Sequence, residues 1–168
     1  MRRGDVESVA VEIVVSLSAQ TLELRRDGIV LCQYAVSTAR NGAGEEQDSE
    51  CTPRGKHLIR AKIGAGCPPG TVFVGRRPTG ETWSPQLERE QPGRDWILTR
   101  ILWLSGTEPG VNRLANVDTM RRYIYIHGTP HENEIGKPVS HGCIRMCNED
   151  IVELFDHVEV GTHVTIQP

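Results

Sequence analysis

The sequence lacks both a long hydrophobic run and an excess of basic residues. Lys and Arg number 19 against 22 Asp and Glu, which gives a formal net charge of -3. Nucleic-acid-binding domains usually carry a dense basic face, so this balance argues against a nucleic-acid partner. No stretch approaches the roughly 18 consecutive apolar residues typical of a transmembrane helix. We therefore expect no membrane span.

The first residues also lack the apolar core of an export signal. Arg2 and Arg3 are basic, but Asp5 and Glu7 follow at once, and Glu12 interrupts the next apolar stretch. A secretory or twin-arginine leader needs an unbroken apolar segment after its basic start. The sequence predicts a cytoplasmic protein, or a periplasmic one if a leader has been removed.

Cysteine is present in an odd number, which disfavours a disulfide framework. We interpret four of the five as small buried apolar residues or surface thiols, namely Cys32, Cys51, Cys67 and Cys147. Apolar residues make up 38% of the chain, enough for a packed core, and no repeat or low-complexity segment divides it. Residues 1–168 are therefore expected to form a single domain.

Alternating apolar residues predict a β-rich fold. In the first strand, the residues on one face are Val9, Val11, Ile13, Val15 and Leu17. Further strands are expected at Thr21–Arg25, Ile29–Val36, His57–Ile63, Thr71–Val74, Trp96–Leu104, Arg122–Ile126 and Val164–Ile166, with loops over 38–56, 64–95 and 105–121. One helix is expected to begin with Asn148 as its N-cap. The predicted class is mainly β, a mixed sandwich-like or barrel-like sheet with a short C-terminal helix.

Two segments carry residues suited to catalysis. One is Ile126-His127-Gly128-Thr129, at the end of a predicted strand, and the other is Ser140-His141-Gly142-Cys143-Ile144-Arg145-Met146. A thiolate is the attacking form of cysteine, and a nearby imidazole or positive charge is expected to lower the pKa of the Cys143 thiol. Gly142 allows close backbone approach, so amides around Cys143 are candidates to stabilise an oxyanion. We interpret Cys143 as a nucleophile and His127 as its base.

Other histidines and a metal site are weighed against this interpretation. His57, His157 and His163 are expected to be structural or exposed, and His131 to be solvated in a polar loop. Zinc is the chemical rival, with possible ligands His127, His131, His141, Cys143 and Cys147. Their spacing lacks the paired CxxC pattern, and we predict no metal and no cofactor. Arg145 is either a surface charge or a carboxylate-binding group.

On these residues the sequence resembles the YkuD-type L,D-transpeptidase family. His127 is followed by a loop of thirteen residues and then His141-Gly142-Cys143, with Ser140 before and Arg145 after. The Thr52-Pro53-Arg54-Gly55 turn also resembles an element of the family. The resemblance extends over most of the chain, and its most specific part is the block from Ser140 to Met146.

The resemblance implies a mainly β catalytic domain with the cysteine in a cleft under a flap. It implies that Cys143 attacks, that His127 is base and then acid, and that the Gly128 carbonyl orients the His127 ring. His141 and Gly142, together with Cys143, would shape the oxyanion site. Substrate-binding residues would be Arg145, Ser140 and Tyr125. The implied partners are peptidoglycan stem peptides or muropeptides, with carbapenem-type β-lactams as inhibitors.

Three functional hypotheses remain open. The leading one is an L,D-carboxypeptidase that removes terminal D-alanine from soluble muropeptides during recycling. The second is an L,D-transpeptidase that forms peptidoglycan cross-links, with an amine in place of water as acyl acceptor. The third is a non-catalytic muropeptide-binding domain that keeps the fold.

Overall fold

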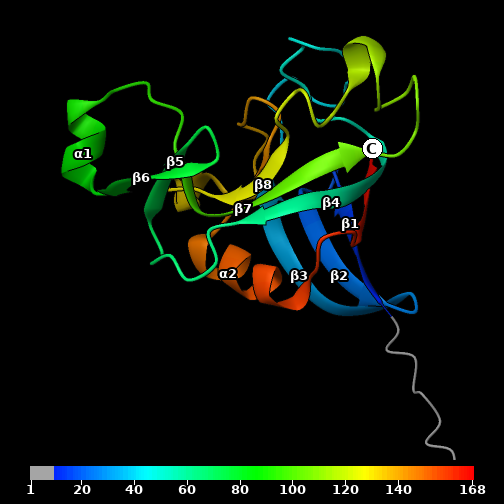
Figure 1. Ribbon diagram of the computed structural model, residues 1–168, viewed down its shortest axis with the longest axis horizontal. Coiled ribbons are helices and arrows are strands. Elements are labelled where there is room, and N and C mark those ends of the chain that lie inside the picture. Colours follow the sequence, from blue (N-terminus) through cyan, green and yellow to red (C-terminus); the bar gives the residue numbers. More distant parts are fainter. Residues whose placement is uncertain (1–9) are drawn as a thin grey trace, which may run out of the picture.

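The computed structural model describes residues 10–168 and is built around one ten-stranded sheet (Figure 1). Val9, which we assigned to the first strand, lies outside the described residues. The strands are β1 Val11–Ser16, β2 Thr21–Arg26, β3 Ile29–Ser37, β4 Gly55–Ile63, β5 Thr71–Val74, β6 Arg77–Thr82, β7 Ile97–Gly106, β8 Tyr125–Gly128, β9 Ile144–Met146 and β10 His163–Gln167. The helices are α1 Pro85–Glu90 and α2 Asn148–His157, with 3₁₀ turns at Ala115–Val117 and Glu132–Glu134. No helix in this part of the chain is long and apolar enough to cross a membrane.

The sheet closes on itself into a barrel. Its strand order runs β4-β10-β1-β2-β3-β9-β8-β7, and the pairing of β7 with β4 completes the ring. Two neighbouring pairs, β1 with β10 and β8 with β9, are parallel, so the sheet is mixed. The hairpin of β5 and β6 hangs from β7 outside this ring. The prediction of a mainly β, barrel-like fold with a short C-terminal helix is confirmed.

The main core joins the barrel strands to α2. Ile151, Leu154 and Phe155 form the buried face of the helix, which contacts β7 and β8. They share one apolar cluster with barrel residues such as Leu102 and Ile126, both fully buried. Burying an aliphatic or aromatic side chain of this size contributes roughly 1.5–3 kcal/mol to folding. The helix therefore packs directly against β8, a strand of the candidate site, and against its neighbour β7.

The segment 64–95 contains more regular structure than the sequence predicted. We expected loops around the strand Thr71–Val74, and the structure adds β6 and α1. β6 is almost entirely exposed and includes Pro78 and Gly80, so it lacks the apolar alternation that reveals a strand. For α1 a signal was present: Ser84 caps the helix by accepting from the Leu87 amide, and Pro85 follows it.

Strand boundaries near the candidate site also differ from the prediction. We placed a strand at Arg122–Ile126, but β8 begins at Tyr125 because Tyr123 adopts a left-handed backbone with φ 56°. His127 therefore lies within a strand and not after one. The short strand β9 was not predicted. The N-cap of α2 is Cys147, and the side chain of Asn148 donates to the Thr129 carbonyl instead of capping the helix.

Candidate active site

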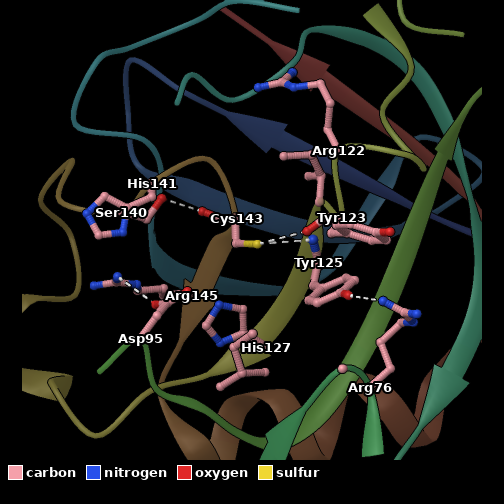
Figure 2. Close-up of a pocket in the computed structure, with 13 residues that line it drawn as sticks. Arg76, Asp95, Arg122, Tyr123, Tyr125, His127, Ser140, His141, Cys143 and Arg145 are labelled. Carbon is pink, nitrogen blue, oxygen red and sulfur yellow. Dashed lines mark hydrogen bonds and ion pairs between the residues drawn. The ribbon is translucent and has the colours of Figure 1, made fainter. Parts of the chain in front are cut away.

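The parallel pairing of β8 with β9 brings His127 and Cys143 into one cavity. His127 pairs with Arg145 in register, and Cys143 immediately precedes β9. Both side chains project into a cavity of about 530 Å³ (Figure 2). The two predicted segments, separated by a loop of thirteen residues in the sequence, are neighbours in space because adjacent strands carry them.

Hydrogen bonds fix the turn that presents Cys143. The Ser140 hydroxyl donates to the Cys143 carbonyl at 2.6 Å and accepts from the Gly142 amide at 3.2 Å. The buried Thr52 hydroxyl donates to the Gly142 carbonyl at 2.9 Å. Gly142 has φ 131°, and a Cβ there would lie 3.2 Å from the Cys51 carbonyl oxygen, so glycine is required. The Gly142 amide is already hydrogen-bonded to the Ser140 hydroxyl within the turn. The amides of His141 and Cys143 are therefore the candidates for an oxyanion site.

The His127 ring has a defined tautomer. Its Nδ1 lies 2.6 Å from the Gly128 carbonyl oxygen, which only accepts, so Nδ1 carries the proton and Nε2 has a free lone pair. Gly128 leaves no space for a side chain, since a Cβ would lie 2.8 Å from the Leu98 carbonyl oxygen. His127 as a whole is 1% exposed. This arrangement suits a base that accepts a proton at Nε2.

The half-buried Cys143 sulfur is held by two backbone groups. It accepts from the Tyr125 amide at 3.3 Å, and its S–H donates to the Tyr123 carbonyl at 3.4 Å (Figure 2). Among residues 10–168, no hydrogen bond joins the sulfur to His127. Proton transfer to Nε2 therefore requires the S–H to turn away from Tyr123 as a substrate binds.

Of the arginines in residues 10–168, three line the cavity, and each has a different environment. Arg122 donates to the carbonyls of Gly44 and Cys51, at 3.2 and 2.7 Å. Arg145 lies 3.7 Å from Asp95, and Arg76 donates to the Tyr125 hydroxyl at 3.0 Å. The cavity is therefore cationic and suited to carboxylates.

A family model described as YkuD, L,D-transpeptidase catalytic domain, matches residues 10–166. The chain belongs to this family. The probable L,D-transpeptidase ErfK/SrfK of Salmonella typhimurium is 37% identical over 102 residues, covering 54% of this chain and 33% of that protein. The putative L,D-transpeptidase YkuD of Bacillus subtilis is 52% identical over 46 residues, covering 27% of this chain and 28% of that protein.

Solved L,D-transpeptidases share the fold. L,D-transpeptidase 3 from Mycobacterium tuberculosis, in complex with a faropenem-derived adduct, has a TM-score of 0.58 at 20% identity, covering 95% of this chain and 60% of that one. LdtMt1 in complex with imipenem has a TM-score of 0.55 at 24% identity, covering 94% of this chain and 58% of that one. At these identities the similarity shows the fold alone. The chain spans about 60% of these structures, and its matches make up about a third or less of the two curated relatives.

The remaining predicted residues of this YkuD-family chain are distributed as follows. His57 is fully buried between the Gly55 carbonyl and the Thr119 hydroxyl, a structural role, while His157 and His163 are exposed. His131 is half-buried and pairs with Glu88, so the prediction that it is simply solvated is wrong. Within residues 10–168 no three His, Cys, Asp or Glu side chains gather as metal ligands.

Two predicted substrate-binding residues make internal contacts. Ser140 lines the cavity, but its hydroxyl is committed to the turn around Cys143. The Tyr125 hydroxyl faces Arg76. The sequence prediction missed Arg76, Asp95 and Arg122 as cavity residues. Arg76 lies in the Gly- and Pro-rich segment 64–95, whose length was the available signal for a wall of a cleft.

Burial shifts the pKa values of both members of the candidate pair. It raises the pKa of the Cys143 thiol to about 12, against smaller lowering effects from the Tyr125 amide, Arg145 and Arg122. Burial also lowers the pKa of His127, because desolvation disfavours the imidazolium. The prediction of a lowered thiol pKa is therefore wrong for this resting state. The pair is a neutral thiol with a neutral imidazole, so deprotonation has to accompany attack.

The raised thiol pKa predicts slow alkylation of the free protein. At pH 7 we expect Cys143 to react with iodoacetamide about 10- to 100-fold more slowly than N-acetylcysteine, because so little thiolate is present. The rate should keep rising with pH between 7 and 10. Peptide mapping by mass spectrometry measures it at Cys143 alone, and a plateau below pH 9 would show that the thiol pKa is low after all.

Proposed function

We propose that this protein is a cysteine acyl-transfer enzyme that acts on peptidoglycan stem peptides. The observation that carries the proposal is the free Nε2 of His127 in the same cavity as the Cys143 sulfur, with Nδ1–H bound to the Gly128 carbonyl. Membership of the L,D-transpeptidase catalytic domain family supports the choice of substrate.

The proposed first step makes a thioester. The Cys143 sulfur attacks the carbonyl of the L-centre of a diamino acid while Nε2 of His127 takes the thiol proton. The amides of His141 and Cys143 stabilise the negative charge that develops on the carbonyl oxygen. His127 then gives the proton to the nitrogen of the leaving D-alanine as the C–N bond breaks.

The cavity supports a short anionic peptide as the donor. Its volume of about 530 Å³ is in the usual range for small-ligand sites. Arg76, Arg122 and Arg145 give it positive charge, and stem peptides carry carboxylates. Guanidinium groups bind carboxylates through two parallel hydrogen bonds, which favours such a peptide over a neutral one.

Water is the proposed acyl acceptor, which gives L,D-carboxypeptidase activity. Water needs no binding site of its own, so hydrolysis is the default fate of a thioester in a solvent-filled cavity. The natural substrates would then be soluble muropeptides. A role in recycling also requires that the native protein meets them in the cytoplasm, which cell fractionation tests.

An L,D-transpeptidase activity is the second candidate. A further cavity of about 260 Å³ shares Asp95, His141 and Arg145 with the first and gives room for another peptide. The Asp95 carboxylate, 59% exposed, faces both cavities and would attract the ammonium group of an acceptor. An amine bound there would compete with water for the thioester.

The two candidates differ in their products from one defined muropeptide. We expect a soluble tetrapeptide to be converted to tripeptide with release of D-alanine, and added D-amino acid or diamino acceptor to change this little. Mass analysis of the products, with and without the acceptor, measures the partition. If most of the product is peptide linked to the acceptor, the protein is a transpeptidase and not a carboxypeptidase. If the tetrapeptide stays unchanged, both proposed activities are refuted.

A further inference from the structure

Arg76 stands at the tip of the β5–β6 hairpin, above the wall of the cavity. The chain reverses through Gly75 and Arg76, both with left-handed backbones at φ 56° and 64°. The guanidinium carbon lies 4.6 Å from the Trp103 ring centre and 4.9 Å from that of Tyr123. These two rings hold the cation in place without neutralising its charge.

Among the three cavity arginines, Arg76 has neither a loop carbonyl nor a carboxylate as a partner within residues 10–168. Arg122 is occupied by the loop carbonyls of Gly44 and Cys51, and Arg145 has Asp95 as a partner. Arg76 spends one donor on the Tyr125 hydroxyl, and no carboxylate within residues 10–168 lies in ion-pair range of it. A guanidinium has five N–H donors, so most of them remain for a ligand.

Tyr125 sets the spacing between this cation and the nucleophile. Its backbone amide donates to the Cys143 sulfur, and its hydroxyl accepts from Arg76 (Figure 2). The guanidinium is therefore one tyrosine side chain away from the sulfur. In a peptide attacked at its penultimate residue, the terminal carboxylate lies one residue, at most ~3.8 Å, beyond the reacting carbonyl. The approach of the sulfur to that carbonyl and a hydrogen bond from the guanidinium each add about 3 Å, so the peptide can bridge the two groups.

The two ends of the cavity differ in charge and in size, so a bound peptide is expected to lie in one orientation only. Figure 2 shows Arg145 and Asp95 on one side of Cys143 and Arg76 on the other. The Arg145 side continues into the second cavity and accommodates a longer chain. The Arg76 side is bounded by the hairpin tip and the aromatic rings, which suits one short terminal residue.

We propose that Arg76 binds the C-terminal carboxylate of the donor peptide, on the leaving side of the scissile bond. This inference rests on the proposed function and adds a determinant of specificity. An enzyme that recognises the free C-terminus through Arg76 removes a terminal residue and leaves internal bonds intact. The ligand chemistry is a peptide α-carboxylate next to a small side chain.

Binding to the Cys143→Ala protein tests the inference without catalysis. The probes are a tetrapeptide that ends in D-alanine and the same peptide that ends in D-alaninamide, titrated by calorimetry or NMR. We expect the acid to bind about 10- to 100-fold more tightly, the usual range for a hydrogen bond to a charged group. Adding Arg76→Gln should reduce this ratio to about one, and Arg76→Lys should restore part of it.

Arg77→Gln is the matched control, because Arg77 is the exposed next residue of the same hairpin and does not line the cavity. That variant should keep the full preference for the acid. If Cys143→Ala with Arg76 intact binds the acid and the amide equally well, the inference is overturned. A loss of affinity for both peptides alike in Arg76→Gln would do the same, since it would reveal a purely structural role.

Turnover by the protein with Cys143 intact separates this inference from the proposed function. If the protein binds the acid preferentially but releases no D-alanine, the proposed function fails and the role of Arg76 stands. If it releases D-alanine and D-alaninamide with equal kcat/KM, the function stands and the role of Arg76 is refuted.

Discussion

The Cys143→Ala variant is expected to release D-alanine from a soluble tetrapeptide on the order of 10⁴-fold more slowly than the unmodified protein, or not at all. Among residues 10–168, the cavity offers no second thiol, and the Ser140 hydroxyl is committed to the turn. Loss of a covalent nucleophile typically has an effect of this size. Coupled detection of free D-alanine measures the rate. Equal release by both proteins would refute the assignment of the nucleophile.

Cys67→Ala is the matched control for this variant. Cys67 is a half-buried free thiol that packs against the same apolar cluster as Cys143. Its removal should leave turnover unchanged. A drop in both variants would point to damage of the shared cluster and not to lost chemistry.

The same pair of variants tests β-lactam acylation. The solved relatives include complexes with imipenem and a faropenem-derived adduct. We expect a carbapenem to add its intact mass to this protein and to Cys67→Ala, and to leave Cys143→Ala unmodified. Modification of none of the three would favour a non-catalytic muropeptide-binding domain.

The sequence predicted the strands in which apolar and polar residues alternate. It did not predict the strands that lack this alternation. β1 and β7 combine apolar faces with β-branched residues, and their positions followed from the sequence. β6 has six mostly exposed residues and β9 only three, too few for a periodic pattern. Closure of the barrel through β4 and β7 depends on pairing between segments far apart in the chain, which periodicity does not encode.

The sequence predicted the reacting groups of the site but not the direction of the thiol pKa shift. Cys143 and His127 stand out because their neighbours suit nucleophilic chemistry, and both line one cavity. The thiol pKa was misjudged because its direction depends on burial, and burial arises from tertiary packing. Arg76 was missed because the turn that carries it reaches the cavity only through the β5–β7 pairing.

Because the pKa of Cys143 is raised, His127 is needed to remove the thiol proton. Because burial raises the thiol pKa to about 12, the thiol is almost entirely protonated at pH 7. The reaction therefore depends on proton removal by His127 during attack. His127→Ala is expected to lower kcat by about 10² to 10⁴, the usual contribution of a general base. His163→Ala, an exposed histidine on β10, is the control and should change nothing.

The pH profile of His127→Ala distinguishes a base from a merely structural residue. In the unmodified protein, burial lowers the pKa of His127, so the imidazole stays neutral as pH falls through 6.5 and activity should decline only at more acidic pH. In His127→Ala only the thiolate reacts, and the rate should rise about tenfold per pH unit from pH 7 to 10. A variant with low but pH-independent activity would contradict the role as base, and full activity would transfer that role to His141. The slope of the rate against pH separates the two roles. A packing defect lowers the rate equally at every pH, whereas loss of the base makes the reaction depend on hydroxide.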